Sequence, residues 1–227
     1  MFWIPPRKQN QYDPVFANNT WAKIIKACQN KEVPETWTVG SQKAMTINGT
    51  AYVIDIIGKG HDNYADGSGK APLTFQLHDC YADVNRMNSS NTNSGGWTSC
   101  AMRSTHLPAI LALMPTEVQN GIREVNKLTS AGSQSSTINT TADKLFLLSE
   151  IEIFGSVSYS KSGEGTQYDY YKAGNSKVKN RNGGAAYWNE RSPLKDGSTQ
   201  FCMVSNTGTA DYGGASSAAG VAFAFCF

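Results

Sequence analysis

The sequence predicts an α+β fold with a mixed, mainly antiparallel sheet and flanking helices. Helix-like and strand-like segments follow one another without the β-α-β regularity of a parallel sheet, and no internal repeat of fixed period occurs. An Asn48-Gly49 dipeptide between two strand-like segments is a strong hairpin signal. With 227 residues, 40% of them hydrophobic, the chain is long enough to bury a sizeable core.

The first half of the chain is expected to hold one helix and several strands. Asn19 or Thr20 can cap a helix within residues 18–30, because its apolar residues recur on one face. Strands are predicted at residues 35–41, at 43–58 with the hairpin turn inside, and at 71–80.

From Trp97 onward, helices are predicted first and strands dominate later. Pro108 suits a first helical turn, and the apolar run stops before Pro115. Helices are therefore predicted at residues 97–115 and 116–122, and a short one at 150–155 capped by Ser149. Strands are predicted at 123–130, 143–149, 185–192, 199–205 and 221–227, with a loop at 131–142.

Composition excludes several classes of function. A net charge of +2 and the lack of a basic stripe argue against nucleic-acid binding. No segment approaches the roughly 18 apolar residues of a membrane span, so no membrane insertion is expected. The N-terminus lacks the apolar run of a signal peptide, which predicts synthesis and folding in a cytoplasm.

The cysteines and histidines predict neither a metal site nor an enzyme. Five cysteines without a C-x-x-C pair are interpreted as buried thiols, although a Cys202–Cys226 bridge stays open if their segments are neighbours. The His61-Asp62 and His78-Asp79 pairs are interpreted as structural hydrogen-bonding groups. Because no catalytic motif is present, we expect no enzymatic activity, no cofactor and no metal.

Several short segments, in a fixed order, resemble one known type of domain. They include "W.VG" at 37–40, "WTSCAMR" at 97–103, "DKLFLLSEIEIFG" at 143–155, "YW..RSP" at 187–193 and the closing "VAFAFCF" at 221–227. Together they resemble the C-type-lectin-like domain of phage and gut-bacterial surface proteins. This domain is similar to the variable proteins that diversity-generating retroelements mutate. The resemblance implies an N-terminal arm at residues 1–17 and a ligand-binding domain at 18–227.

The same resemblance implies where a ligand would bind. In such domains an apolar frame, here Trp188, Phe201 and Val204, holds exposed and changeable side chains between its members. Tyr212 and Leu194 would be apolar anchors of the contact set. The set is Asn189, Glu190, Leu194, Lys195, Asp196, Thr199, Gln200, Met203, Ser205, Thr207, Asp211 and Tyr212.

The function implied is that of a phage receptor-binding protein, or adhesin, at a tail or fibre tip. Its location would be the virion, its partner a host cell-surface protein or glycan, and its arm would dock to a virion protein. Weak single sites favour a homo-oligomer such as a trimer. Two alternatives stay open: a structural virion component of the decoration or baseplate kind, and an enzyme of the formylglycine-generating kind that uses Cys202 and Cys226. Calcium-dependent sugar binding is not expected, because the chain has no Glu-Pro-Asn motif.

Overall fold

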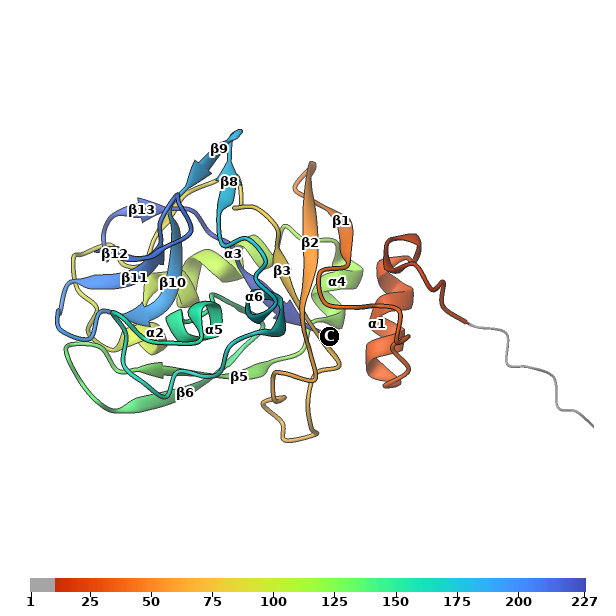
Figure 1. Cartoon of the computed structure of the whole chain (residues 1–227), viewed down its shortest axis with the longest axis horizontal. Coiled ribbons are helices and arrows are strands. Elements are labelled where there is room, and N and C mark those ends of the chain that lie inside the picture. Colours follow the sequence, from red (N-terminus) through yellow and green to blue (C-terminus); the bar gives the residue numbers. More distant parts are fainter. Residues whose placement is uncertain (1–10) are drawn as a thin grey trace, which may run out of the picture.

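The computed structural model describes residues 11–227, which form an α+β fold with antiparallel sheets (Figure 1). The largest sheet has five strands in the order β1-β2-β3-β14-β7, and every neighbouring pair is antiparallel. This confirms the predicted fold class at the level of α+β. The strands are β1 (Gln42–Ile47), β2 (Thr50–Lys59), β3 (Leu73–Leu77), β7 (Leu145–Phe146) and β14 (Ala224–Cys226).

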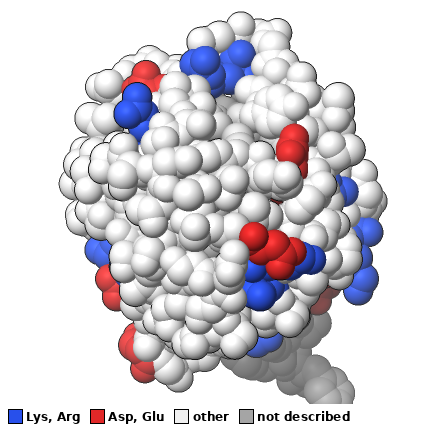
Figure 2. Space-filling view, turned by 90° about the vertical axis from the view of Figure 1, so that its left-hand side faces the viewer, with Lys and Arg blue, Asp and Glu red and all other residues white. Residues whose placement is uncertain are grey.

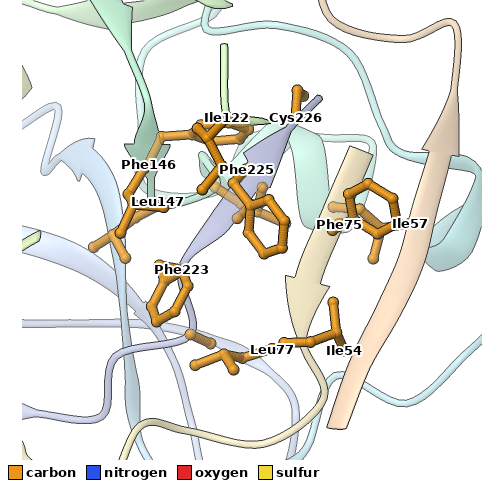
Figure 3. Packing of buried hydrophobic residues seen from close by; sticks show 14 of the residues in the cluster. Ile54, Ile57, Phe75, Leu77, Ile122, Phe146, Leu147, Phe223, Phe225 and Cys226 are labelled. Atoms are coloured by element: carbon orange, nitrogen blue, oxygen red, sulfur yellow. The ribbon is translucent and has the colours of Figure 1, made fainter. Parts of the chain in front are cut away.

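The last residues of the chain form the centre of this sheet. Strand β14 pairs with β3 on one side and β7 on the other. Figure 3 shows the Phe223 and Phe225 rings between Phe146 and Leu147 on one side and Phe75 on the other. These side chains are completely buried, and the Phe75 and Phe225 rings stack at 5.3 Å. The strand predicted at 221–227 is confirmed only as the three residues of β14, although all seven residues are buried in the core.

The predicted N-terminal helix is confirmed as α1 (Trp21–Gln29), and Thr20 is its cap. The Thr20 hydroxyl accepts a hydrogen bond from the Lys23 amide at 3.2 Å, which satisfies one of the free amides of the first turn. Helix α1 packs against α4 (Thr116–Gly121). A Cβ atom at Gly121 would lie 2.7 Å from the Ile25 side chain, so the close approach requires glycine.

The boundary predicted at residue 17 is too late. Phe16 lies in a short 3-10 turn, η1 (Phe16–Asn18), and both Tyr12 and Phe16 are buried against the Trp37 ring. Residues 11–17 thus belong to the folded body. The rest of the predicted arm, residues 1–10, lies outside the described residues.

A second sheet, three-stranded, lies at the other end of the molecule from α1 (Figure 1). It has the order β10-β11-β12, with β10 (Trp188–Pro193), β11 (Gln200–Val204) and β12 (Ala210–Gly214). Three two-stranded pairs complete the strands: β4 (Asn85–Arg86) with β13 (Ala218–Ala219), β5 (Val125–Ser130) with β6 (Ile138–Asp143), and β8 (Lys179–Arg181) with β9 (Gly184–Ala186).

The remaining helices are short. They are α2 (Gly96–Ser99), the π-helix η2 (Met102–His106), α3 (Leu107–Leu111), α5 (Glu150–Phe154) and α6 (Asp169–Lys172). The predicted helix at 97–115 is thus interrupted, because Cys100 adopts an extended conformation that ends α2. The prediction of a short helix capped by Ser149 is confirmed by a complete capping box.

Some predicted strands and loops are wrong. Residues 35–41 form turns instead of a strand, and Trp37 is an anchor whose indole Nε1 donates to the Asp13 carbonyl at 3.0 Å. The predicted loop at 131–142 contains β6, a strand of mostly polar residues that pairs along its length with β5. The strand predicted at 143–149 shrinks to the two residues of β7. Strands β4, β8, β12 and β13 were not predicted, and β9 overlaps only the first two residues of the strand predicted at 185–192.

Candidate ligand-binding face

Eight of the twelve predicted contact residues are exposed or partly exposed. They lie on residues 194–200, on the turn after β11, and on β12, which is an edge strand. We call residues 194–200, which connect β10 to β11 and include the first residue of β11, loop 194–200. Figure 2 views this end of the molecule, where most of the surface is neither acidic nor basic and charged side chains occur in small scattered groups. We call the following eight residues the β12 face: Leu194, Lys195, Asp196, Thr199, Gln200, Thr207, Asp211 and Tyr212.

The other four predicted contact residues are buried, and this corrects the expectation that they meet a ligand. Asn189, Glu190, Met203 and Ser205 expose 2%, 0%, 8% and 4% of their surface. The expectation assumed that one side of each strand faces solvent. Strand β10 instead packs against α2, α5 and β5, so both of its sides are covered.

Loop 194–200 is held in place by hydrogen bonds with two other parts of the chain. The Lys195 amide donates to the Tyr159 carbonyl at 2.8 Å, and the Lys195 ammonium donates to the Ser158 carbonyl at 2.6 Å. The fully buried Asn93 donates its side-chain amide to the Gly197 and Gln200 carbonyls at 2.9 and 2.8 Å. The loop is therefore preorganised, and its side chains are presented from a rigid support.

An exposed aromatic pair lies beside this loop. Tyr212 is 45% exposed, and its ring meets the Tyr159 ring edge to face at 5.0 Å. Tyr159 and Asn93 were not predicted to belong to the site. The Asn in "NTNSGG" and the Tyr in "VSYS" stand in ordinary loop composition, so only the tertiary structure brings them here.

Ser205 takes part in a turn of hydroxyl groups between β11 and β12. Its Oγ lies 2.9 Å from the Thr207 hydroxyl and 2.7 Å from the Thr209 hydroxyl. The same Oγ accepts hydrogen bonds from the backbone amides of Thr207 and Thr209. Gly208 adopts a φ of +80° in this turn. Ser205 thus fixes the turn that carries the exposed Thr207.

A buried ionic network supports the β12 face from inside. The Arg191 guanidinium of β10 is completely buried and bonds both carboxylate oxygens of Glu152, at 2.5 and 2.8 Å. The Lys127 ammonium of β5 lies 2.7 Å from a carboxylate oxygen of Glu152 and 2.7 Å from one of Asp62. These bonds connect β10, β5 and α5 to the segment that carries Asp62.

His61, Asp62 and Glu152 are the group within residues 11–227 whose ligand atoms come close enough to hold a metal ion, within 4.8 Å of one another. The Lys127 ammonium occupies the position between the two carboxylates. Burial raises the pKa of Asp62, but the charge and hydrogen bond of Lys127 outweigh this and hold it at about 2. Lys127 therefore supplies the positive charge that these carboxylates require.

Two other glutamates of this region keep their protons more readily than usual. Burial raises the pKa of Glu164 to about 7, against hydrogen bonds from Ser192 and the Ser130 amide that lower it. Burial, reinforced by the Glu150 charge, raises the pKa of Glu190 well above its usual value. Within the described residues, neither Glu190 oxygen has a hydrogen-bond partner.

The five cysteines are free and buried, which excludes a Cys202–Cys226 bridge in this structure. Cys202 lies in the three-stranded sheet and Cys226 in the five-stranded one. Burial raises the pKa of both thiols well above the usual value. Neither thiol therefore has the lowered pKa of an activated cysteine.

Comparison with known proteins identifies one family. A search of curated proteins and a search of solved structures return no match. In the part of the chain that the structure describes, no helix has the length and apolar character needed to cross a membrane. A family model described as a domain of unknown function, DUF6273, matches residues 73–227, which run from β3 through β14 and include the β12 face. The chain therefore belongs to the DUF6273 family.

Proposed function

We propose that this protein is a C-type-lectin-like receptor-binding domain of a phage tail or fibre tip, and that the β12 face contacts the receptor. The observation that carries the proposal is the rigid presentation of loop 194–200 and β12. Their exposed side chains rest on strands β10 and β11, which are buried on both sides. Such a face can change its exposed residues without loss of core packing.

Several properties of the β12 face support recognition of a macromolecule. Tyr212 and Tyr159 provide apolar contact area at a low cost in side-chain entropy. Lys195, Asp196 and Asp211 place charges of both signs around this pair, which favours orientation of a partner over simple charge attraction. Because loop 194–200 is already ordered, binding does not require it to lose further freedom.

In this proposal the protein acts on the virion as a homo-oligomer, for example a trimer, with its N-terminal residues docked to another virion protein. A single face of this size would bind weakly. Several linked copies raise apparent affinity by roughly 10²–10⁴-fold.

Adsorption to bacteria tests the proposal. Purified protein is incubated with a panel of gut-bacterial isolates, and bound protein is measured by flow cytometry. Tyr212→Ala should reduce adsorption at least tenfold, whereas Lys26→Ala, an exposed change on α1 at the other end of the molecule, should not. Neither substitution should change the free energy of unfolding by more than about 0.5 kcal/mol, which is usual for surface changes.

Two results would contradict this proposal. Adsorption that is equal for Tyr212→Ala and wild type would remove the β12 face from recognition. Binding to purified virions but to no cell would favour a structural virion component instead.

A further inference from the structure

A second candidate site lies between two hairpins, away from the β12 face. The β1–β2 and β8–β9 hairpins project next to each other at the top of Figure 1 and form the walls of a cleft of about 500 Å³. Residues 50–53 line one wall, residues 180–183 line the other, and residues 78–80 with Ala82 form the floor. This volume is within the range of about 300–1,000 Å³ that ligand sites occupy.

The floor of the cleft carries an imidazole that is held in one orientation. His78 Nδ1 lies 2.8 Å from a carboxylate oxygen of Asp55, whose side chain is 1% exposed. The Gln42 amide donates to the other Asp55 oxygen at 2.8 Å. A carboxylate beside Nδ1 keeps a proton on that nitrogen, and this hydrogen bond raises the pKa of His78. Nε2 therefore accepts a hydrogen bond in the neutral ring and donates one in the protonated ring. The His78 side chain is 41% exposed and lines the cleft, so its ring can form a hydrogen bond with a ligand.

The backbone of the floor is fixed from below. The buried Lys179 ammonium donates to the Leu77 and His78 carbonyls at 2.5 and 2.9 Å. The Tyr52 ring stacks on the Tyr81 ring at 5.4 Å, and the Tyr52 hydroxyl accepts the Ala82 amide at 3.2 Å. The polar groups of the cleft are thus ordered before any ligand arrives.

Two charged side chains keep free hydrogen-bonding capacity at the cleft. One oxygen of Asp79 accepts the Asn180 amide at 2.7 Å, and its other oxygen has no partner within residues 11–227. Arg181 uses Nη1 to donate to the Ala82 carbonyl at 3.0 Å, while its Nε and Nη2 have no partner in the same range. The two side chains are not paired with each other. An unpaired acceptor and an unpaired donor therefore line one cleft.

This arrangement selects the charge of a ligand. An anion would be attracted by Arg181 but repelled by Asp79. A cation would be attracted by Asp79 but repelled by Arg181. A neutral ligand with several hydroxyl groups matches both, because each hydroxyl donates one hydrogen bond and accepts others. The Tyr52 ring adds an apolar surface of fixed orientation for the carbon face of such a ligand.

We propose that the cleft between the β1–β2 and β8–β9 hairpins binds a neutral saccharide, with Asp79 as acceptor, Arg181 as donor and the His78 ring as a further hydrogen-bonding group. An adjoining hollow of about 510 Å³ shares Ala82 and Arg181 with the cleft, so a chain of more than one sugar unit can extend into it. The site is separate from the β12 face and does not depend on the function proposed for that face.

The experiment uses the full chain on an array of neutral and acidic oligosaccharides, followed by calorimetric titration with the strongest neutral sugar. We expect selective binding of neutral sugars. Asp79→Ala and Arg181→Ala should each weaken binding at least about tenfold, because each removes a hydrogen bond to a charged group. Tyr212→Ala, which alters the β12 face, should bind the sugar as wild type does.

The Arg181→Ala variant protects the test against misfolding, since Arg181 lies on the β8–β9 hairpin and forms no ion pair within residues 11–227. Circular dichroism verifies that both variants are folded. The proposal fails if no neutral sugar binds, if only acidic sugars bind, or if a bound neutral sugar is unaffected by both substitutions. Sugar binding that is lost in Tyr212→Ala but kept in Arg181→Ala would also overturn it, and would assign the sugar to the β12 face.

Discussion

At the scale of single residues, Arg191 is the side chain on which the packing of β10 depends most. All three nitrogens of its guanidinium donate hydrogen bonds. The acceptors are the Glu152 carboxylate, the Thr129 hydroxyl and the carbonyls of Leu128, Leu147 and Glu164. A buried charge is tolerated only when it is paired and satisfied in this way. Arg191 therefore joins the frame below the β12 face to the rest of the domain.

Removal of this charge should strongly destabilise the protein. Arg191→Met leaves Glu152 buried with Lys127 as its remaining cation, so we expect a loss of about 3–5 kcal/mol in the free energy of unfolding. Urea denaturation measures it. The exposed Arg86→Met is the matched control and should change stability by less than about 0.5 kcal/mol. Equal losses in the two variants would show that the network contributes little.

Glu190 should make the protein less stable as pH rises. Its pKa in the folded state is raised well above the usual value, so the folded protein keeps a proton that the unfolded chain releases above a pH of about 4.3. Stability contributed by the protonated form is thus lost as pH increases from that value.

Glu190→Gln keeps the shape of the side chain but cannot ionise, so unfolding of the variant releases no proton from this position. The variant should be more stable than wild type at pH 8, and its stability should decline less steeply between pH 5 and 8. Part of the decline should persist up to about pH 7, because the pKa of Glu164 is raised in the same direction. Urea titrations at pH 5, 6, 7 and 8 measure these slopes, and identical slopes in variant and wild type would refute the assignment to Glu190.

At the scale of elements, α5 shows how a short helix is held by its first turn. The Ser149 hydroxyl accepts the Glu152 amide at 3.4 Å, and the Glu152 carboxylate accepts the Ser149 amide at 3.1 Å. The same hydroxyl donates to the Glu164 carbonyl at 2.8 Å. The cap therefore also orients Glu152 toward Arg191, which ties a local signal to the buried network.

Loss of this cap should cost more than loss of an exposed one. Ser149→Ala is expected to lower the free energy of unfolding by about 1–2 kcal/mol, since it leaves the buried Glu152 amide without its partner and removes one of two hydrogen bonds to the Glu164 carbonyl. Thr20→Ala removes the exposed cap of α1 and should cost about 0.5–1 kcal/mol. Thermal and urea denaturation of the two variants compare them directly. A larger loss in Thr20→Ala would contradict the role given to the buried cap.

At the scale of the whole molecule, the five-stranded sheet pairs strands that are far apart in the sequence. Strand β14 is the last element of the sequence and lies in the middle of the sheet, beside β3 and β7. The Tyr64 hydroxyl donates to the carbonyl of Phe227 at 2.6 Å, so the final residue is also fixed. The five-stranded sheet therefore lacks its link between β3 and β7 until residues 224–226 are present.

A chain that ends at residue 220 should not fold cooperatively. The truncation removes the completely buried Val221, Phe223, Phe225 and Phe227 and leaves β3 and β7 without their common neighbour. Near-ultraviolet circular dichroism and calorimetry should show no cooperative melting. Phe225→Ala, which keeps the backbone of β14, should fold with a loss of about 3–5 kcal/mol. A truncated chain that melts like wild type would refute this account.

Local sequence was sufficient for elements whose signals lie within a few residues. The Asn48-Gly49 turn joins β1 and β2, Thr20 begins α1, and Ser149 begins α5, each as predicted. These features follow from turn geometry, capping and helical periodicity, which neighbouring residues determine. The apolar C-terminal strand was predicted for a related reason, since nearly every residue of 221–227 is hydrophobic.

Tertiary structure decided which of the predicted contact residues are exposed. A period-2 pattern predicts that alternate side chains of a strand point to opposite sides of the sheet. It does not predict whether either side is open to solvent. Asn189 and Glu190 are polar and were expected outside, yet α2, α5 and β5 cover β10 and bury both. Tyr159 contacts the β12 face and the buried Asn93 supports it, both from distant segments. The reason is the same: burial and proximity depend on long-range packing, which no short stretch of this chain encodes alone.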